Sequence, residues 1–484
     1  MNKQIRILAT AMAVLFTALF AQVNYLQIFH AKTLDQNPLN TRTVVADFAR
    51  PRGIIQTSDG AVLARSVPVN DEFQRQRQYP EGALFAHITG YLSFTYGGEG
   101  VERTYNDDLV GRNQTFKLKD LSDLLVKKEK TGDVTLTLSK KLQQVASDAL
   151  GQRKGAVVAL DPSTGAILAM ADYPSYDPNV LASHNEKDVR AAWDALNADP
   201  DKPLVSRAYR ERYFPGSSFK VVTAATALAT GSATTSDPVY PQLSALPLPN
   251  SGGQTLSNFG GEVCGGNIVQ ALQVSCNTAY AQLGMDLGAD KLSTGAAAFG
   301  FGKAPPIDLP FPAESAFPPA SAFARDIPGL AKSAIGQQDV QATPLEMALV
   351  AAGIANGGVI MTPHVMQDVR DTDGNVVDRY NPKPWLTAVP PDVASTVRDM
   401  MVNVVNKGTG TAAQIPGIQV AGKTGTAQTG LGKTHVWFES FAPAANPKIA
   451  VAVMLENLPL ESDATGGTVA APIAKAVIQA ALGG

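Results

Sequence analysis

The chain has 484 residues, of which 45% are hydrophobic and 17% are charged. That length and apolar content are ample for a sizeable core and for more than one domain. The formal net charge of −3 excludes the strongly basic balance of a nucleic-acid-binding protein, and two cysteines are too few for a disulfide framework. The five histidines are scattered singly, which argues against a zinc site.

The N-terminus has the composition of a membrane anchor. Lys3 and Arg6 precede an uncharged, mostly apolar stretch at residues 7–29. A span needs roughly 20 such residues, and positive charge before it favours an N-terminus inside the cell. A cleaved signal peptide is the competing interpretation, but no convincing small-x-small cleavage site follows the apolar run. We predict a cytoplasmic tail at 1–6, a single-pass anchor in the cell membrane at 7–29, and the rest of the chain on the extracytoplasmic face.

Residues 30–139 are polar and charged, and they predict a small accessory module without obvious chemistry. Short β-like pieces at 53–56 and 61–64 flank Asp59-Gly60, a hairpin turn signal. The charge-rich stretch Lys117–Lys130 is typical of a solvated surface.

Residues 140–484 alternate strands and helices. A strand at 133–138 and a helix at 139–153 with Ser139 as its N-cap lead into a hairpin that turns at 161–165. Two further strands are predicted at 434–443 and 447–457, and a last helix at 472–482. Strands at both ends with helices between them indicate one α/β (α+β) domain, whose sheet joins its first and last portions.

Ser217 and Lys220 form the first candidate catalytic pair. They stand three residues apart in a helix predicted to open after Pro215-Gly216 and to stop at Gly231, so both side chains share one helical face. A serine hydroxyl needs a base within hydrogen-bond reach, and a lysine can be that base when burial lowers its pKa. S-x-x-K also occurs by chance in many helices, so the pair needs independent support.

Ser275 and Asn277 form a second polar pair. A hydroxyl can relay a proton, and a carboxamide can hold a peptide group through its donor and its acceptor. Alone, Ser-x-Asn is more often a helix N-cap than a catalytic element. Cys276 lies between them and, with Cys264, could form one disulfide in an oxidising compartment or remain a buried thiol.

The stretch Gly417–Thr424 matches the G-x-x-x-x-G-K-[ST] pattern of phosphate-binding loops. Such a loop must bend and then start a helix directly, whereas residues 418–421 are largely apolar and β-branched, and a glycine-rich segment follows. The stretch therefore predicts a strand, with Thr424 and Thr426 on one face, and the nucleotide match is accidental.

The three motifs occur in one predicted domain in the order S-x-x-K, S-x-N, K-T-G, a combination that β-lactamases and penicillin-binding proteins share. The surrounding sequence resembles class B penicillin-binding proteins, the monofunctional D,D-transpeptidases, and is most similar to an actinobacterial group of them. The similar segments are residues 155–179, 203–220, 275–277, 334–358, 420–428, 435–443 and 466–472, with 50–55 and 100–111 before the domain. No glycosyltransferase-like region stands before it, which argues against a bifunctional class A enzyme.

The resemblance implies a penicillin-binding, serine β-lactamase-like transpeptidase domain at 140–484, with an antiparallel sheet flanked by helices and a non-catalytic pedestal of the dimer-domain type at 30–139. It implies cross-linking of peptidoglycan stem peptides through a serine acyl-enzyme. The implied catalytic residues are Ser217, Lys220, Ser275 and Lys423, and the implied substrate-binding residues are Asn277, Thr424, Gly425 and Thr426. The N–H groups of Ser217 and Thr426 are expected to form the oxyanion hole.

The expected partners are stem peptides ending in D-Ala-D-Ala, β-lactam antibiotics, the membrane and, by resemblance alone, a polytopic glycan polymerase. No cofactor, metal, nucleotide or nucleic acid is expected. Three rival functions use the same fold: a β-lactamase, a β-lactam sensor and a non-enzymatic scaffold. The sequence has no clear E-x-x-x-N-type base for a β-lactamase, and only residues 1–6 are available as a cytoplasmic output for a sensor.

Overall fold

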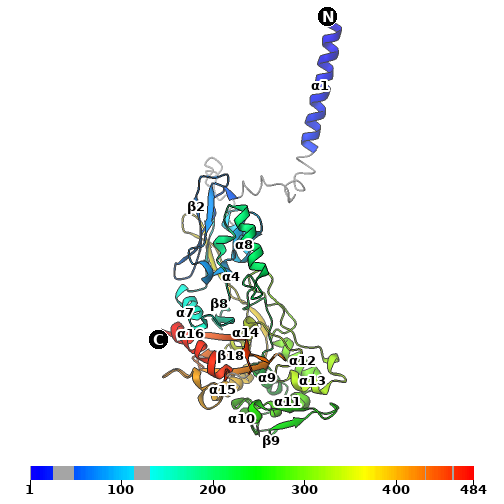
Figure 1. Ribbon diagram of the computed structural model, residues 1–484, viewed down its shortest axis with the longest axis vertical. Helices are drawn as coiled ribbons and strands as arrows, with labels where there is room; N and C mark the ends of the chain where they lie inside the picture. Colours follow the sequence, from blue (N-terminus) through cyan, green and yellow to red (C-terminus); the bar gives the residue numbers. More distant parts are fainter. Residues whose placement is uncertain (1, 26–47, 114–130, 431, 461–462, 484) are drawn as a thin grey trace. The chain divides into compact units, whose positions relative to one another are not determined.

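The computed structural model describes residues 2–25, 48–113, 131–430, 432–460 and 463–483 (Figure 1). Two compact units can be distinguished. The first contains Met1–Pro51 and Ser66–Gln76, and the second contains Arg52–Arg65 and Arg77–Gly484. The predictions for anchor residues 26–29 and for Lys117–Lys130 lie outside the described residues.

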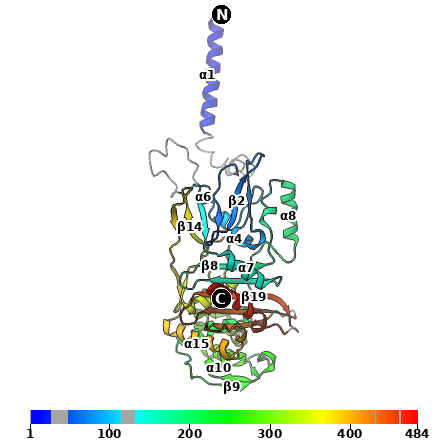
Figure 2. The ribbon, with the colours of Figure 1, turned by 90° about the vertical axis from the view of Figure 1, so that its left-hand side faces the viewer.

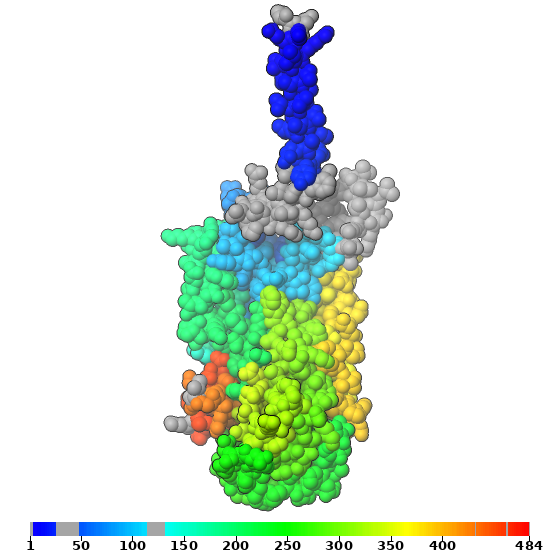
Figure 3. Space-filling view, turned by 90° about the vertical axis from the view of Figure 1, so that its right-hand side faces the viewer, coloured from blue at the N-terminus to red at the C-terminus, as the bar shows by residue number. Residues whose placement is uncertain are grey.

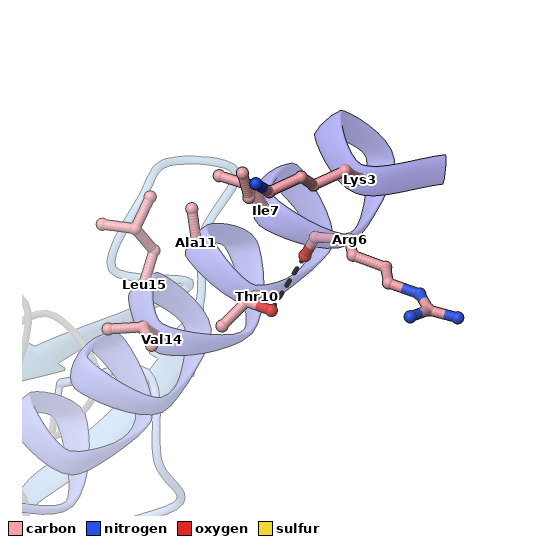
Figure 4. A pocket seen from close by; sticks show the side chains of 7 residues that line it. All are labelled: Lys3, Arg6, Ile7, Thr10, Ala11, Val14 and Leu15. Carbon is pink, nitrogen blue, oxygen red and sulfur yellow. Dashed lines mark hydrogen bonds between the residues drawn. The ribbon is translucent and has the colours of Figure 1, made fainter. Parts of the chain in front are cut away.

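The first unit contains α1 (Asn2–Tyr25). Its segment Lys3–Tyr25 is long and apolar enough to cross a membrane, and no part of its most apolar stretch is buried by other residues. Figure 4 shows Ile7, Val14 and Leu15 projecting from the helix surface, and Thr10 Oγ1 donating a hydrogen bond of 2.8 Å to the carbonyl of Arg6. A helix satisfies its backbone polar groups internally, which a membrane-spanning segment requires.

The second unit is built around a five-stranded antiparallel sheet in the order β17-β18-β19-β7-β8. Its strands are β7 (Gly155–Leu160), β8 (Ile167–Tyr173), β17 (Ala421–Gln428), β18 (Lys433–Ala442) and β19 (Ile449–Pro459). Val453 of β19 pairs with Val157 of β7. The prediction that one sheet joins the first and last portions of this domain is therefore confirmed.

Alternation of side chains along these strands creates two apolar faces. Val157, Phe438 and Val453 pack with α7 (Lys140–Leu150) and α16 (Ala471–Leu482) on one face. Trp437 and Met454 pack on the other face with α9 (Lys220–Ala229) and α14 (Pro344–Ala355). Ser139 caps α7 by accepting a hydrogen bond from the N–H of Leu142, as predicted. The sheet is therefore covered by helices on both faces, which places its edge strand β17 at the side of the domain.

A second sheet, smaller in number of residues, contains strands from distant parts of the chain, in the order β15-β14-β6-β1-β2-β3, where β3 is Arg75–Gln78. The early strands are β1 (Ile55–Gln56), β2 (Val62–Pro68) and β6 (Asp133–Leu136), and the late ones are β14 (Met366–Arg370) and β15 (Val376–Arg379). Ile55 pairs with Ala64 across the predicted Asp59-Gly60 turn. Figures 2 and 3 show the yellow late strands beside the blue and cyan early segments. The sequence did not predict this long-range pairing.

Three buried charges lie beside the smaller sheet. Glu102 of α5 (Gly100–Thr104) is fully buried and accepts hydrogen bonds from Arg52 Nε at 2.7 Å and from Arg77 Nε at 2.6 Å. Arg52 also donates to the carbonyl of Glu102 at 2.8 Å, and Arg77 donates to the carbonyl of Gly53 at 2.9 Å. The carboxylate is thus enclosed by two guanidinium groups.

The remaining elements surround these two sheets. In the early chain they are η2 (Gly82–Leu84), α4 (Ala86–Thr89), β4 (Leu92–Ser93), β5 (Gly97–Gly98), α6 (Asn106–Leu109), η5 (Pro178–Val180), α8 (Glu186–Ala198) and η6 (Gly216–Phe219). Between α9 and α14 they are β9 (Tyr240–Leu243), β10 (Ala245–Pro247), β11 (Thr255–Ser257), η7 (Phe259–Gly261), β12 (Cys264–Gly266), α10 (Ile268–Gln273), α11 (Asn277–Leu287), α12 (Ala289–Ala298), η8 (Ala320–Phe323) and α13 (Ile327–Ser333). After α14 they are β13 (Val359–Met361), β16 (Pro384–Thr387), α15 (Pro391–Lys407), η9 (Thr411–Ala413) and η10 (Gly466–Ala470).

Candidate active site

Ser217 lies in the short helix η6, which continues directly into α9. The sequence predicted an α-helix from Ser217 onward, whereas the first turn is a 3₁₀ turn. The turn is tight because its hydrogen bonds join residues three apart, as from the N–H of Lys220 to the carbonyl of Ser217. Side chains at i and i+3 eclipse each other in a 3₁₀ turn, so Ser217 and Lys220 still share one face. The half-buried Ser217 hydroxyl makes no hydrogen bond to any residue that the structure describes.

Glycines hold this turn against the edge strand β17. Gly216 has φ +53°, and a Cβ there would lie 2.7 Å from the carbonyl oxygen of Thr426. A Cβ on Gly425 would lie 2.6 Å from both the Pro215 carbonyl and the Ser218 hydroxyl. Real Cβ atoms do not approach other atoms so closely, so only glycine permits the contact at either position. The glycine of the Lys-Thr-Gly motif therefore brings β17 next to the serine turn.

Lys220 begins α9 and is fully buried. Its Nζ donates hydrogen bonds of 2.7 Å to the carbonyl of Ser275 and of 2.7 Å to Asn277 Oδ1, and it lies 3.4 Å from Ser275 Oγ. Nζ also lies 5.6 Å from the centre of the Tyr280 ring. The structure thus brings the S-x-x-K and S-x-N motifs into direct contact.

Ser275 has φ +61°, the left-handed region that non-glycine residues rarely adopt. Residues held in such conformations cluster at functional sites. Asn277 starts α11, and its Nδ2 donates a hydrogen bond of 3.1 Å to the carbonyl of Ser257. The Asn277 amide is therefore fixed at both ends, but it retains one further donor and one further lone pair.

Lys423 approaches the same serine from β17. Its Nζ donates 2.9 Å to Ser275 Oγ and 2.8 Å to the carbonyl of Thr424. Like Lys220, Lys423 is fully buried. Two lysine amines therefore lie within 3.4 Å of one hydroxyl oxygen.

Burial dominates the electrostatics of the two lysines. Burial lowers the pKa of Lys220 well below its usual value, and the charge of Lys423 lowers it further. Burial lowers the pKa of Lys423 to about 7, against an opposing effect of Glu439. A neutral amine near pH 7 is what a general base requires.

The threonines of the Lys-Thr-Gly motif lie on the same strand as predicted. Thr424 Oγ1 shares a hydrogen bond of 2.6 Å with Thr409 Oγ1, and Thr426 is half-buried. Lys423 to Thr426 form part of a regular antiparallel pairing with β18, in which Thr424 pairs with Phe438. A strand, not a bent loop followed by a helix, therefore carries the lysine.

Cys264 and Cys276 are joined by a disulfide with a Cα–Cα distance of 5.8 Å. The bond links β12 to the residue between Ser275 and Asn277. Asn258 supports the same segment, because its Oδ1 accepts a hydrogen bond of 2.9 Å from the N–H of Thr278. The loop that carries the S-x-N motif is thus held by a covalent bond and a hydrogen bond.

Two polar residues beside the site were not singled out from the sequence. Thr409 lies before η9 and contacts Thr424. Glu439 is a buried acid in β18, directly opposite Lys423. An acid among the large apolar residues of HVWFESFAP was a signal that could have drawn attention to Glu439, because carboxylates are rarely fully buried without a partner. Thr409 had no comparable signal.

The arrangement gathers two buried lysines, Ser275 and the amide of Asn277 around one point, and the turn that carries Ser217 contacts the edge strand of Lys423. Residues 155–479 match the family model described as "Penicillin binding protein transpeptidase domain". Residues 52–134 match the family model described as "Penicillin binding protein A dimerisation domain". The chain therefore belongs to the penicillin-binding protein transpeptidase family, as a class B member.

Individual relatives agree with this assignment. The chain is 40% identical over 498 residues to the peptidoglycan D,D-transpeptidase PbpA of Mycolicibacterium smegmatis, covering 100% of this chain and 99% of the relative. It is also 40% identical to PbpA of Mycobacterium tuberculosis, covering 100% of both chains. The ceftriaxone acyl-enzyme complex of penicillin-binding protein A from M. tuberculosis has a similar structure, with a TM-score of 0.84, 40% identity, and coverage of 90% of this chain and 100% of that one.

Proposed function

We propose that this chain is a peptidoglycan D,D-transpeptidase that works through a serine acyl-enzyme and is inhibited by β-lactams. The observation that carries the proposal is the convergence of Lys220 and Lys423 on Ser275, beside the turn that holds Ser217. The relatives named as peptidoglycan D,D-transpeptidases and the acyl-enzyme complexes of similar structure support the same activity.

In the first half-reaction, Ser217 Oγ attacks the carbonyl of the penultimate D-Ala of a stem peptide, and neutral Lys220 accepts the hydroxyl proton. The ester bond forms as the amide bond to the terminal D-Ala breaks. Ser275, hydrogen-bonded to Lys423, relays a proton to the departing amine. In the second half-reaction, an amine of another stem attacks the ester, which closes the cross-link and releases Ser217.

The other residues hold the substrate. The N–H groups of Ser217 and Thr426 form the oxyanion hole, where one donor is commonly worth about 2.7–4 kcal/mol. The close approach of Gly216 to Thr426 supports that role. Thr424 and Thr426 bind the terminal carboxylate with their hydroxyls. Gly425 admits the close approach of β17 to the serine turn. Asn277 holds the substrate backbone through its remaining donor and lone pair.

The same proposal covers location and organisation. Residues 1–6 form a cytoplasmic tail, α1 belongs to a membrane anchor at 7–29, and the transpeptidase domain at 140–484 stands outside the membrane on a pedestal at 30–139. The apolar, uncovered surface of α1 and the positive charges of Lys3 and Arg6 in its first turns support this orientation. A polytopic glycan polymerase in the same membrane is the partner that the family resemblance favours.

The proposal is tested with the full chain in detergent, as wild type and as Ser217→Ala. A fluorescent penicillin is added, and the label is followed over time by gel and by intact mass. A stable one-to-one adduct in the wild type, absent from the variant, is the expected result. Rapid loss of the label with turnover would instead identify a β-lactamase, and no adduct at all would overturn the site.

A stable adduct alone does not separate a transpeptidase from a sensor or a scaffold. Incubation with a D-Ala-D-Ala stem peptide and an acceptor amine makes that distinction. We expect release of D-Ala and formation of a cross-linked product by the wild type only. Acylation by penicillin without any reaction on the stem peptide would favour a sensor.

A further inference from the structure

The site holds one ionisable group for which the reaction sequence above has no role. Glu439 of β18 is directly opposite Lys423 in the antiparallel register, and it is 1% exposed. Neither of its carboxylate oxygens has a hydrogen-bond partner among the described residues. A buried carboxylate without hydrogen bonds is costly, so its presence in a strand of the central sheet requires a reason.

The position of Glu439 relates it to one amine. Residues directly opposite each other in an antiparallel pair have Cβ atoms about 4.5–5.5 Å apart and project on the same face. The two side chains are therefore neighbours, yet they form no salt bridge within 4.0 Å, because Lys423 Nζ is directed to Ser275 and Thr424 instead. Glu439 is therefore a neighbour of Lys423, and the hydrogen bond from Lys423 Nζ to Ser275 Oγ is kept.

Three ionisable groups thus follow one another across the site: Glu439, Lys423 and Lys220. The two amines both lie within 3.4 Å of Ser275 Oγ, and like charges so close together in a buried site disfavour double protonation. At most one of the two amines is therefore favoured to carry a proton. The mechanism works only if the neutral amine is Lys220, because that amine must accept the proton of Ser217.

We propose that Glu439 is a positioning residue that keeps the proton on Lys423, so that Lys220 remains the neutral base. This inference rests on the function proposed above. The carboxylate stabilises the ammonium form of Lys423 by its charge, and the ammonium in turn disfavours protonation of Lys220. No atom of Glu439 touches the substrate or the reacting atoms in this role.

Burial and the charge of the neighbouring group act on each of the two pKa values in opposite directions. Burial raises the pKa of Glu439 well above its usual value, and the charge of Lys423 opposes that rise. Burial lowers the pKa of Lys423, and the charge of Glu439 opposes that fall. Each charged form therefore stabilises the charged form of the other, against the effect of burial.

Other charged groups on the surrounding elements lie elsewhere. On β18 itself, Lys433 and His435 stand at the opposite end of the strand, and Glu456 of β19 binds Arg207 at 3.2 Å. Lys475 of α16 lies on the helix that covers the other face of the sheet. Glu346 of α14 is buried beside Gly300 and Trp385. Among the described groups, Lys423 is the one whose charge acts on Glu439.

Glu346 provides a matched control. It is a second fully buried acid whose carboxylate oxygens lack hydrogen-bond partners among the described residues. Burial raises its pKa to about 8, and no charge of a described residue opposes that rise. Glu346→Gln therefore changes a buried acid to an amide without acting on Lys423. Glu439→Gln makes the same chemical change but removes the carboxylate opposite Lys423.

The test is the pH dependence of acylation by a fluorescent penicillin, measured as a second-order rate constant on the full-length chain. The wild-type profile falls on the alkaline side as Lys423 loses its proton. A charge within about 4–6 Å shifts a pKa by about 1–3 units, so the alkaline limb of Glu439→Gln should move to lower pH by at least about one unit. At a pH above the alkaline limbs of both proteins, this shift makes the acylation rate constant of Glu439→Gln about tenfold or more lower than that of the wild type. Glu439→Asp should keep most of the wild-type profile, and Glu346→Gln should keep all of it.

An alkaline limb of Glu439→Gln that coincides with that of the wild type would overturn the inference. A lower rate at every pH with an unmoved limb would do the same, because it indicates a merely structural role. Neither result would affect the proposed function, which fails only if the wild type forms no adduct at Ser217.

A second measurement covers the case in which Glu439→Gln does not fold. The wild type is labelled with ¹³C at lysine Cε, and the two buried lysines are assigned by loss of their resonances in Lys220→Met and Lys423→Met. We expect a mostly charged Lys423 and a neutral Lys220 at pH 6, below the pKa of about 7 of Lys423. A neutral Lys423, or a proton on Lys220, would overturn the inference.

Discussion

The molecule contains two clusters of buried charge that differ in how completely their members are paired. Beside the smaller sheet, Glu102 is enclosed by Arg52 and Arg77 and accepts hydrogen bonds from both. In the active site, two lysines converge on one hydroxyl, and the nearest carboxylate has no hydrogen bond among the described residues. A saturated cluster fixes a fold, whereas an unsaturated one keeps protonation states that chemistry can use.

The comparison predicts that removing a charge has opposite consequences in the two places. In the active-site cluster, catalysis should be lost and stability largely kept. In the cluster around Glu102, stability should be lost and catalysis kept in the molecules that remain folded.

Lys220→Met should have the largest effect. Loss of a general base typically costs about 10²–10⁴ in rate, so acylation by penicillin should fall by that factor. The free energy of unfolding should change by no more than about 1–3 kcal/mol, the usual cost of leaving buried acceptors without a donor. Stopped-flow labelling and urea denaturation measure the two quantities. A variant that acylates at the wild-type rate would show that Lys220 is not the base.

Glu102→Gln should reduce stability strongly. Removing one partner of a buried ion pair costs about 3–5 kcal/mol, and here two guanidinium groups would lose their carboxylate. The acylation rate per folded molecule should stay within about twofold of wild type. The control is Glu81→Gln, whose partner Lys140 is 44% exposed, so a cost of less than about 1 kcal/mol is expected. Equal costs for the two variants would contradict the contrast between saturated and exposed pairs.

Gly425→Ala should have an intermediate effect on acylation. The added methyl group would lie 2.6 Å from the Pro215 carbonyl and the Ser218 hydroxyl, so β17 and the serine turn must separate. Misplacement by about 1 Å can cost about 10²-fold in rate. Gly98→Ala is the control in the early chain, because its Cβ would meet no atom closer than 3.5 Å. An unchanged acylation rate of Gly425→Ala would mean that the serine turn and β17 can move apart without loss of activity.

The smallest expected effect is on the acid dependence of stability. Burial alone would raise the pKa of Glu102, but the charges of Arg52 and Arg77 outweigh it and hold the pKa below its usual value. A carboxylate with a lowered folded pKa stabilises the protein above its unfolded pKa of about 4.3, and this stabilisation is lost as pH falls through the folded pKa. The free energy of unfolding should therefore decline less steeply below about pH 4 in Glu102→Gln than in the wild type. Parallel declines would show that Glu102 is not responsible for this loss.

The sequence predicted those parts of the fold that local pattern determines. The hairpin at Asp161 forms with the N–H of Gly165 bonded to the Asp161 carbonyl at 2.8 Å, and Ser139 caps its helix. Both depend on neighbours within a few residues. The contact of Ser275 with Lys423 and the approach of the Ser217 turn to β17 were inferred from motif order and resemblance, because no local rule brings together residues so distant in sequence.

The features that the sequence did not predict depend on tertiary packing. The 3₁₀ turn at Ser217 accompanies the close approach of Gly216 to Thr426, which no propensity scale includes. The contact of Thr409 with Thr424 joins a loop to a strand. The role inferred for Glu439 requires the register of β17 on β18, since a shift of one residue would move the carboxylate to the other face of the sheet.

The pairing of β6 with β14 has a consequence for synthesis of the protein. Leu136 of β6 pairs with Met366 of β14, so the smaller sheet lacks its late strands until about 230 further residues have been made. At about 5–20 residues per second, β6 waits for roughly 10–50 seconds with an unpaired edge. An exposed strand edge is a template for pairing with other chains. A ribosome that pauses between these strands therefore prolongs exposure of the nascent chain to aggregation.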